Sequence, residues 1–276
     1  MTKKTALVTG AGGGLGHATV ERLLAGGWKV FAADLSKDLL RTSMHDPDAV
    51  PVVMDVTDQE SIQSAYDTVA SQADRLDAIV NFAGVMGVGS LTDIPEARLA
   101  RILDINVMGT YRVNKTFLPL VEAAKGRIVN LSSETGWQSA APFNGPYAMS
   151  KHAIEAYSTA LRRELALLGI KVVTIQPGAF RTNMVAGIED AFTAAEAETP
   201  KFAQALRKLK ALAGKEIESA RDPDILAQVI EDALTVKRPK PVYSVKPDLL
   251  RSTIERLPLK TADRLYLAVL RRAHKG

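Results

Sequence analysis

Residues 9–16 read Thr-Gly-Ala-Gly-Gly-Gly-Leu-Gly and lie between a short apolar run, residues 5–8, and a helical pattern over residues 15–25. Glycines at such a junction let the backbone turn sharply and let a phosphate approach the positive N-terminus of the helix. The order of strand, glycine loop and helix therefore predicts the first unit of a dinucleotide-binding α/β sheet. No lysine follows the loop as GxxxxGK[ST] requires, which argues against a P-loop nucleotide site.

Apolar runs and helical patterns alternate along the rest of the chain. The predicted strands cover residues 5–8, 30–33, 51–54, 78–80, 127–131, 171–175 and 241–244. The predicted helices cover residues 15–25, 59–73, 97–123, 146–168 and 223–236. Apolar strands joined by helical crossovers are typical of a parallel sheet that is covered on both faces. We therefore expect a doubly wound, mostly parallel α/β fold of the Rossmann type, with about seven strands in a single domain.

Two segments are set apart from this pattern. Residues 179–214 are rich in Ala, Lys and Glu, contain no strand pattern and follow a strand end, where such sheets bind ligands. We expect them to form a substrate-covering segment of a catalytic domain that spans residues 1–236. Residues 237–276 would add the last strand and a basic C-terminal extension with an amphipathic helix over residues 261–273.

Composition excludes several classes of protein. Of the 276 residues, 46% are apolar and 24% are charged, which is ordinary for a globular protein. There is no cysteine, so disulfides and thiol nucleophiles are excluded, and a reducing compartment is the simpler expectation. The four histidines are scattered and do not predict a metal site. No membrane span or signal peptide is indicated, and we expect a cytoplasmic protein.

The positive charge is concentrated at the C-terminal end. Residues 237–276 hold 11 Lys or Arg against 3 Asp or Glu, a local charge of +8, whereas the whole chain carries only +4. The remainder is therefore mildly acidic, which argues against nucleic acid as a partner. The amphipathic helix has two interpretations. It packs its apolar stripe on the body with Arg264, Arg271 and Arg272 in solvent, or it forms a lid over an apolar site or a peripheral contact with anionic lipid.

A candidate acid/base pair lies at the start of the helix over residues 146–168. Tyr147 and Lys151 are four residues apart, so they share one face of the helix. The charge of Lys151, together with the positive charge of an oxidised nicotinamide, is expected to lower the pKa of Tyr147 and fit it for general acid/base catalysis. Ser132 and Ser133 end the strand over residues 127–131, where a hydroxyl can bind the reacting oxygen.

The end of the second predicted strand bears on the choice of cofactor. Asp34 lies about 20 residues beyond the glycines, where a carboxylate binds the ribose hydroxyls of NAD and repels the 2′-phosphate of NADP. NAD is therefore expected in preference to NADP. The alternative is that Asp34 only forms a turn or a helix cap beside Ser36.

Together these residues resemble the short-chain dehydrogenase/reductase family over residues 5 to about 185. The motifs that carry the resemblance are TGxxxGxG at residues 9–16, Asp34, Asp55-Val56, Asn81-Phe-Ala-Gly84, Asn106, Ser133, Tyr147 with Lys151, and Pro177-Gly178. The resemblance implies that Tyr147 is the general acid/base, that Lys151 lowers its pKa and binds the nicotinamide ribose, that Ser133 orients the substrate oxygen, and that Asn106 holds a water in a proton relay. It implies cofactor contacts at Gly10, Gly14, Leu15, Gly16, Asp34, Asp55, Val56, Asn81, Ala83, Gly84, Tyr147, Lys151, Pro177, Gly178 and Thr182.

Three features depart from the family pattern. Gly12 and Gly13 stand where members usually carry hydroxyl or basic residues, and Phe82 stands where an asparagine is more usual. Ser133 precedes Tyr147 by 14 residues, one more than in many members, which leaves Ser132 as the alternative substrate-orienting hydroxyl.

The residues expected to face the nicotinamide are apolar: Val85, Met86, Trp137, Phe143, Met184 and Val185. The alternative for Trp137 and Phe143 is that they anchor their loop in the core. An apolar pocket with one polar reacting group predicts hydride transfer with a secondary alcohol or ketone on a hydrophobic skeleton, such as a steroid, a retinoid or another lipophilic alcohol. The alternatives are a non-catalytic NAD-binding protein and a membrane-surface or partner-binding protein on the same fold. The resemblance also implies a homodimer or homotetramer formed through the helices over residues 97–123 and 146–168.

Overall fold

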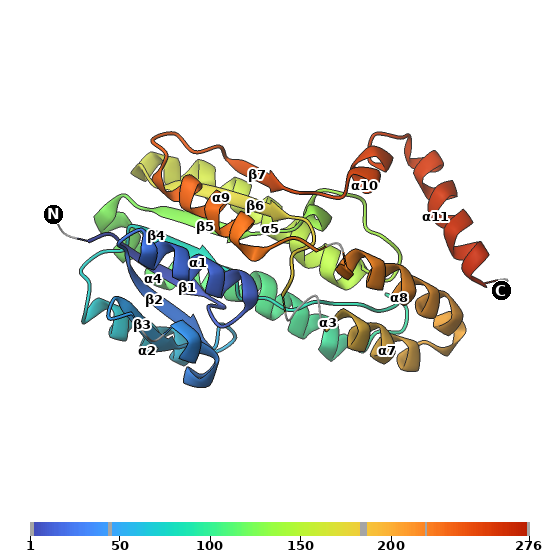
Figure 1. The fold of residues 1–276 in the computed structure, drawn as a ribbon, viewed down its shortest axis with the longest axis horizontal. Helices are drawn as coiled ribbons and strands as arrows, with labels where there is room; N and C mark the ends of the chain where they lie inside the picture. Colours follow the sequence, from blue (N-terminus) through green and yellow to red (C-terminus); the bar gives the residue numbers. More distant parts are fainter. Residues whose placement is uncertain (1–2, 44–45, 183–186, 219, 275–276) are drawn as a thin grey trace.

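The computed structural model describes residues 3–43, 46–182, 187–218 and 220–274. A seven-stranded sheet with the order β3-β2-β1-β4-β5-β6-β7 lies at its centre, and all of its strand pairs are parallel (Figure 1). The strands are β1 (Thr5–Thr9), β2 (Lys29–Asp34), β3 (Ala49–Val53), β4 (Ala78–Asn81), β5 (Arg127–Leu131), β6 (Lys171–Pro177) and β7 (Val242–Val245). The doubly wound fold with about seven strands is confirmed.

Helices connect and cover the strands. The α-helices are α1 (Gly14–Ala25), α2 (Gln59–Ala70), α3 (Glu96–Leu103), α4 (Thr110–Ala124), α5 (Gly145–Leu165), α7 (Ile188–Glu198), α8 (Ala203–Glu218), α9 (Pro223–Thr235), α10 (Leu249–Ile254) and α11 (Leu259–His274). Short helical segments are η1 (Lys37–Ser43), the π-helical η2 (Asp104–Gly109), η3 (Glu134–Gly136), η4 (Ala166–Leu168) and η5 (Pro200–Phe202).

The prediction of one uninterrupted helix over residues 97–123 is wrong, because η2 separates α3 from α4. Two contacts occupy this stretch. Asn106 binds the backbone of Val85 through its side-chain amide. Gly109 lies so close to Val56 that an added Cβ would be 2.7 Å from a methyl group of that valine. A π-helical turn widens the helix locally, and such turns are frequent at functional sites.

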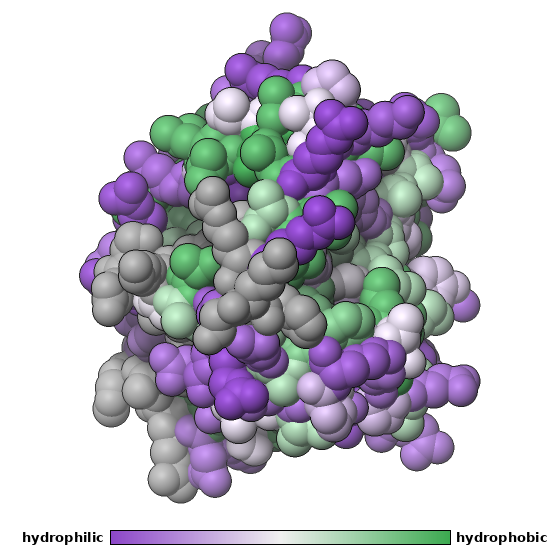
Figure 2. Space-filling view, turned by 90° about the vertical axis from the view of Figure 1, so that its right-hand side faces the viewer, coloured by the Kyte–Doolittle hydropathy of each residue, from purple (hydrophilic) through white to green (hydrophobic). Residues whose placement is uncertain are grey.

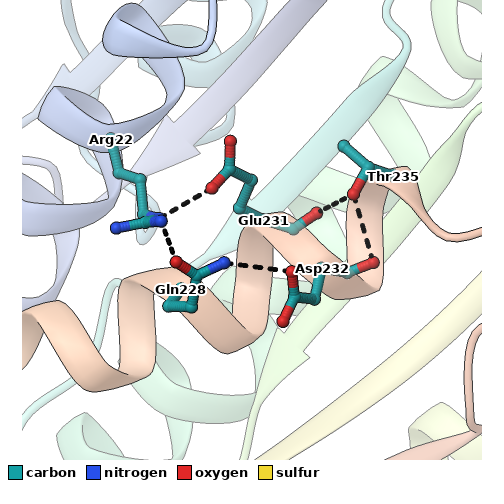
Figure 3. A network of polar contacts seen from close by, with 5 residues as sticks. All are labelled: Arg22, Gln228, Glu231, Asp232 and Thr235. Atoms are coloured by element: carbon teal, nitrogen blue, oxygen red, sulfur yellow. Dashed lines mark hydrogen bonds and ion pairs between the residues drawn. The ribbon is translucent and has the colours of Figure 1, made fainter.

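Alternate residues of each strand contribute to two separate cores, as the period of two requires. Ala6 and Val8 of β1 pack with α1 and α9 on one face of the sheet, whereas Leu7 packs with α2 and α4 on the other. Polar contacts also join α1 to α9 (Figure 3): Arg22 Nε donates to Glu231 Oε2 at 2.7 Å, and the guanidinium of Arg22 also binds Gln228. The sheet is therefore covered on both faces, and its ligand crevice lies at the carboxyl ends of the strands.

The segments after β6 and β7 gather beyond this end of the sheet. Figure 1 shows α7, α8, α10 and α11 at one end of the molecule, at the right of the view. The amphipathic helix expected over residues 261–273 is α11, and α10 is an additional helix that periodicity did not predict. Within the described ranges, no helix has both the length and the apolar character that crossing a bilayer requires.

Candidate active site

The glycine loop is shaped by contacts that leave no space for side chains. A Cβ on Gly16 would lie 2.2 Å from the carbonyl oxygen of Gly10, and one on Gly12 would lie 2.5 Å from that of Leu39. Gly10 also has a φ of 64°, which favours glycine. Gly12 therefore stands in place of the usual hydroxyl or basic residue for a physical reason: the backbone of η1 occupies the space that a side chain at position 12 would need.

The glycine loop leads into the N-terminus of α1, which is suited to binding a phosphate. α1 begins at Gly14, its N-cap Gly13 provides no side-chain cap, and its first turn carries no acidic residue. The first N–H groups of a helix have no partner within the helix, and the helix dipole makes this end attractive to anions. Gly10, Gly14, Leu15 and Gly16 all line one large cavity at this point. The backbone therefore fits the pyrophosphate of a dinucleotide.

The carboxylates predicted to bind the adenosine half lie along the same cavity. Asp34 ends β2 and accepts hydrogen bonds from the backbone N–H groups of Gly12, at 2.9 Å, and Leu35, at 2.8 Å. These contacts direct its carboxylate to the glycine loop, where a ribose would lie. Asp55 and Val56 also line the cavity, but the Asp55 carboxylate accepts from both the backbone and the hydroxyl of Thr57, so it also forms the turn.

Residues 81–84 divide between the cavity and the core. Ala83 and Gly84 line the cavity. Asn81, predicted to contact the cofactor, instead has its side chain in a buried cluster of amides, where its Nδ2 donates to Asn114 and Asn130 at 2.8 and 3.0 Å. Asn81 ends β4 with its side chain directed at β5 and α4, so its contribution is to join these elements below the cavity.

Tyr147 and Lys151 lie on the first turns of α5, where their side chains reach the carboxyl end of β5. Lys151 Nζ is 5.5 Å from the centre of the Tyr147 ring and donates to the carbonyl oxygen of Leu131 at 2.9 Å. The Ser133 hydroxyl lies in hydrogen-bond contact with the Tyr147 side chain. The structure therefore brings together Ser133, Tyr147 and Lys151, all of which line the cavity. Ser132 is directed elsewhere, because its hydroxyl donates to the backbone of Lys151 at 3.4 Å.

Without a bound cofactor, the side chains of the protein do not by themselves lower the pKa of Tyr147. Burial raises the pKa of Tyr147 to about 12, against a smaller lowering by the hydrogen bond of Ser133 and with a further increase from the charge of Glu134. Burial likewise lowers the pKa of Lys151 to about 8. The spacing predicted the proximity of the two groups correctly, and the cost of burying a charge is the largest cause of both pKa shifts.

Asn106 supports the site from below and does not line the cavity. Its Oδ1 accepts from the backbone N–H of Val85 at 2.7 Å, and its Nδ2 donates to the Val85 carbonyl at 2.9 Å and to Ser150 Oγ at 3.0 Å. Both amide hydrogens are thereby used. The side chain thus braces the strand end before Val85, and the water that we expected at Asn106 would need its carbonyl or the second lone pair of Oδ1.

One cavity of about 1570 Å³ joins the glycine loop to the catalytic residues and continues beneath α7, α8, α10 and α11. Of the residues predicted near the nicotinamide, Val85, Met86, Phe143, Pro177, Gly178 and Thr182 line it. Thr182 contacts Gly14, where an added Cβ would be 3.0 Å from its methyl group. The prediction for Trp137 is wrong, since it is absent from the described walls and is 38% exposed. Met184 and Val185 lie outside the described residues.

Among the polar residues of this cavity that sequence reasoning missed are Glu134, Arg251 and Tyr266. Glu134 follows Ser133 directly and is only 5% exposed. Arg251 of α10 and Tyr266 of α11 come from the C-terminal extension, so that extension forms part of the wall. A signal for Tyr266 was its place in the apolar stripe of the helix, whereas nothing in the sequence distinguishes Glu134 from a solvated glutamate.

Comparisons with known proteins agree with this geometry. The family model described as short chain dehydrogenase matches residues 4–192. Estradiol 17-beta-dehydrogenase 2 of Rattus norvegicus is 36% identical over 264 residues, which cover 87% of this chain and 68% of that protein. Retinol dehydrogenase 16 of Rattus norvegicus is 32% identical over 256 residues, covering 87% of this chain and 80% of that protein.

A solved structure is similar along the whole chain. A short-chain dehydrogenase from Streptomyces avermitilis superposes with a TM-score of 0.77 and 26% identity, covering 100% of this chain and 98% of that one. Because the family model and the relatives span the glycine loop, β5 and α5, the match includes the site as well as the fold. The chain belongs to the short-chain dehydrogenase family and is an oxidoreductase that acts on CH–OH groups with a nicotinamide dinucleotide.

Proposed function

We propose that the protein transfers a hydride between NAD and a secondary alcohol or ketone on a lipophilic skeleton. The observation that carries the substrate class is the cavity, which at about 1570 Å³ exceeds the ~300–1,000 Å³ of ordinary ligand pockets and leaves room beyond a dinucleotide. Its walls beyond Tyr147 are largely apolar: Met86, Val88, Phe143, Phe180, Phe192, Leu209 and Leu212. The similarity to an estradiol and a retinol dehydrogenase supports the same class.

The side chains divide the work at the reacting oxygen. When bound, the nicotinamide accepts or supplies the hydride. In oxidation, Tyr147 as phenolate takes the proton of the substrate hydroxyl while the carbinol C–H bond breaks; in reduction, its phenol O–H returns that proton to the carbonyl oxygen. Ser133, in contact with Tyr147, supplies a second hydrogen bond to the same oxygen. Lys151 fixes this geometry through its bond to Leu131 and is within reach of a ribose beside Tyr147.

A preference for NAD over NADP is supported by Asp34. Its carboxylate faces the glycine loop at the end of β2 and carries the charge that accepts a ribose diol and repels a 2′-phosphate. Residues 35 and 36, which follow it directly, carry no positive charge that would receive the phosphate.

The test is absorbance of reduced nicotinamide with NAD and NADP separately, against steroid, retinoid and simple secondary alcohols. We expect turnover with NAD and a lipophilic alcohol, and a loss of at least 100-fold in kcat for Tyr147→Phe with unchanged NAD binding by calorimetry. Turnover with NADP alone would overturn the assignment of Asp34. Bound NAD without turnover on any alcohol of the panel would favour a non-catalytic binder.

A peripheral contact with an anionic membrane surface is a second proposal, and it accounts for the C-terminal extension. Leu249 and Leu250 of α10 are 78% and 71% exposed, close in sequence to the exposed Arg256 and Lys260. Figure 2 views the molecule from the end that carries these helices and shows hydrophobic and hydrophilic groups side by side on its surface. Exposed leucines next to cationic side chains favour binding to anionic lipid. We place this contact on the cytoplasmic face of a membrane, because a chain without cysteine suits a reducing compartment.

Vesicle sedimentation tests this contact with the full-length protein. The double variant Leu249→Asp/Leu250→Asp should lose binding to vesicles that contain phosphatidylserine, whereas Leu167→Asp, at an equally exposed leucine on η4, should retain it. Equal binding by the double variant and the wild type would overturn the proposal.

The proposed homodimer or homotetramer would use α4, α5 and the π-helical turn before α4. Met108, Tyr111 and Met149 are large apolar residues exposed on these elements. Light scattering should give a mass of two or four chains, and Tyr111→Asp should shift it toward one.

A further inference from the structure

The segment that follows Ser133 is fastened to α10 of the C-terminal extension. Ser133 itself caps η3 by accepting from the backbone of Thr135 at 3.2 Å. Three hydrogen bonds then join this segment to α10 and its two caps: Asp248 N to Glu134 Oε2 at 2.6 Å, Gln138 Nε2 to Ser252 Oγ at 3.3 Å, and Ser139 Oγ to Glu255 Oε2 at 2.7 Å. The residues just beyond the catalytic serine therefore have partners more than 100 positions away in the chain.

Glu134 is the central residue of this contact. It is only 5% exposed, and Gln138 is fully buried. A buried carboxylate is costly unless hydrogen bonds satisfy it, and the 2.6 Å bond from the Asp248 backbone is a short one for an N–H donor. Asp248 is in turn the N-cap of α10, since its Oδ1 accepts from the backbone of Arg251 at 3.0 Å. The bond thus connects the start of α10 to the residue next to Ser133.

We propose that Glu134 is a positioning residue through which α10 holds Ser133 against Tyr147. The proposal rests on the assignment of Ser133 and Tyr147 as the pair that binds the reacting oxygen. It makes the C-terminal extension a structural part of the catalytic site as well as a wall of the cavity. A displacement of about 1 Å at such a pair lowers the rate by up to ~100-fold. Loss of the bond to Glu134 would therefore lower the rate of hydride transfer, although Glu134 does not contact the substrate.

The backbone at residue 248 permits a specific test of the bond. Asp248 has a φ of −63°, the value that proline imposes, so Asp248→Pro removes the N–H donor and keeps the conformation. Asp248→Ala loses the same side-chain cap of α10 but retains the N–H. The comparison of these two variants isolates the hydrogen bond to Glu134.

We expect Asp248→Pro to have a kcat about tenfold lower than Asp248→Ala, with equal Kd for NAD. Hydrogen exchange of residues 249–254 should be faster in the proline variant. In a Glu134→Ala background the two Asp248 variants should become equal, because the acceptor is absent in both. Equal kcat and equal exchange of the two variants in the wild-type background would overturn the proposal.

A change of charge without loss of the acceptor provides a second readout that does not require Glu134→Ala to fold. The charged groups beside Tyr147 are Lys151 from α5 and Glu134 from η3, and Arg251 from α10 lines the same cavity. Glu134→Gln keeps an oxygen for Asp248 N but removes a negative charge that raises the pKa of Tyr147. The rising limb of alcohol oxidation should therefore move to lower pH, with α10 exchange unchanged.

Glu122→Gln, an exposed residue at the end of α4, is the matched control and should match the wild type in every assay. An unshifted pH profile for Glu134→Gln would show that Glu134 does not face Tyr147 as proposed. If the wild type turned over no alcohol, the proposed function would fail, while exchange of α10 in the Asp248 pair would still decide the role of Glu134.

Discussion

Replacing Lys151 by methionine should stabilise the folded protein while abolishing turnover. Lys151 is buried, and burial lowers its pKa from 10.5 to about 8. Because the folded pKa lies below the unfolded one, the folded state holds the lysine proton less tightly. The penalty is complete below pH 8 and disappears as the pH rises toward 10.5.

The size of the effect follows from this shift. A lowering of about 2.5 pKa units corresponds to a penalty of ~3 kcal/mol at pH 7. The variant also loses the hydrogen bond to Leu131, which contributes ~1 kcal/mol. The expected net gain is therefore ~2 kcal/mol at pH 7, and at pH 9.5 it should fall to nearly zero, because the wild type recovers ~2 kcal/mol over this interval.

Urea unfolding at pH 7, 8.5 and 9.5 measures the gain, since the pKa of Tyr147, at about 12, keeps its titration outside this range. Lys240→Met, at an exposed lysine before β7, is the control and should show no gain that declines with pH. A Lys151→Met variant that is less stable than the wild type at pH 7, or equally stabilised at every pH, would refute the reasoning. It would mean that Lys151 is satisfied as a cation in the folded state.

Two further outcomes test the cofactor half of the site, and a third tests the stability of α8. Asp34→Ala should weaken NAD by about tenfold and NADP less, measured by calorimetry, because a repulsive charge is removed with the ribose acceptor. Gly16→Ala should destabilise the protein by at least ~2 kcal/mol in urea and abolish NAD binding, since its Cβ would lie 2.2 Å from a backbone oxygen. Gly214→Ala, in α8 with open space around it, should instead stabilise by ~0.5–1 kcal/mol.

The sequence was sufficient for the features that depend on local order. Apolar runs between helical patterns predicted all seven strands. The glycines at residues 9–16 predicted a loop before the first helix, which is where α1 begins. Both predictions depend only on neighbouring residues. The four-residue spacing of Tyr147 and Lys151 likewise placed them together on α5. It could not predict the interruption of the helix by η2, which depends on Asn106 binding Val85, 21 residues earlier.

The residues that sequence reasoning missed are those whose role depends on distant segments. Trp137 is a large aromatic residue of the kind expected in an apolar pocket, yet it does not line the described cavity and is 38% exposed. Glu134 has the sequence context of a surface residue, yet it is buried and accepts a hydrogen bond from Asp248, more than 100 residues later. The family resemblance assigned Asn81 to the cofactor, whereas its side chain is hydrogen-bonded to the buried amides of Asn130 in β5 and Asn114 in α4.

The pKa values of Tyr147 and Lys151 bear on how the pair operates. With values of about 12 and about 8, the lysine loses its proton long before the phenol does. The protein alone therefore holds Tyr147 as a proton donor throughout neutral pH, which suits delivery of a proton to a carbonyl oxygen. Removal of a proton from an alcohol requires the phenolate, so oxidation should rise with pH over the range in which reduction is flat. Burial raises the pKa of Tyr147, and additional positive charge beside it would lower that pKa again. The size of this lowering therefore sets which direction of the reaction the enzyme favours.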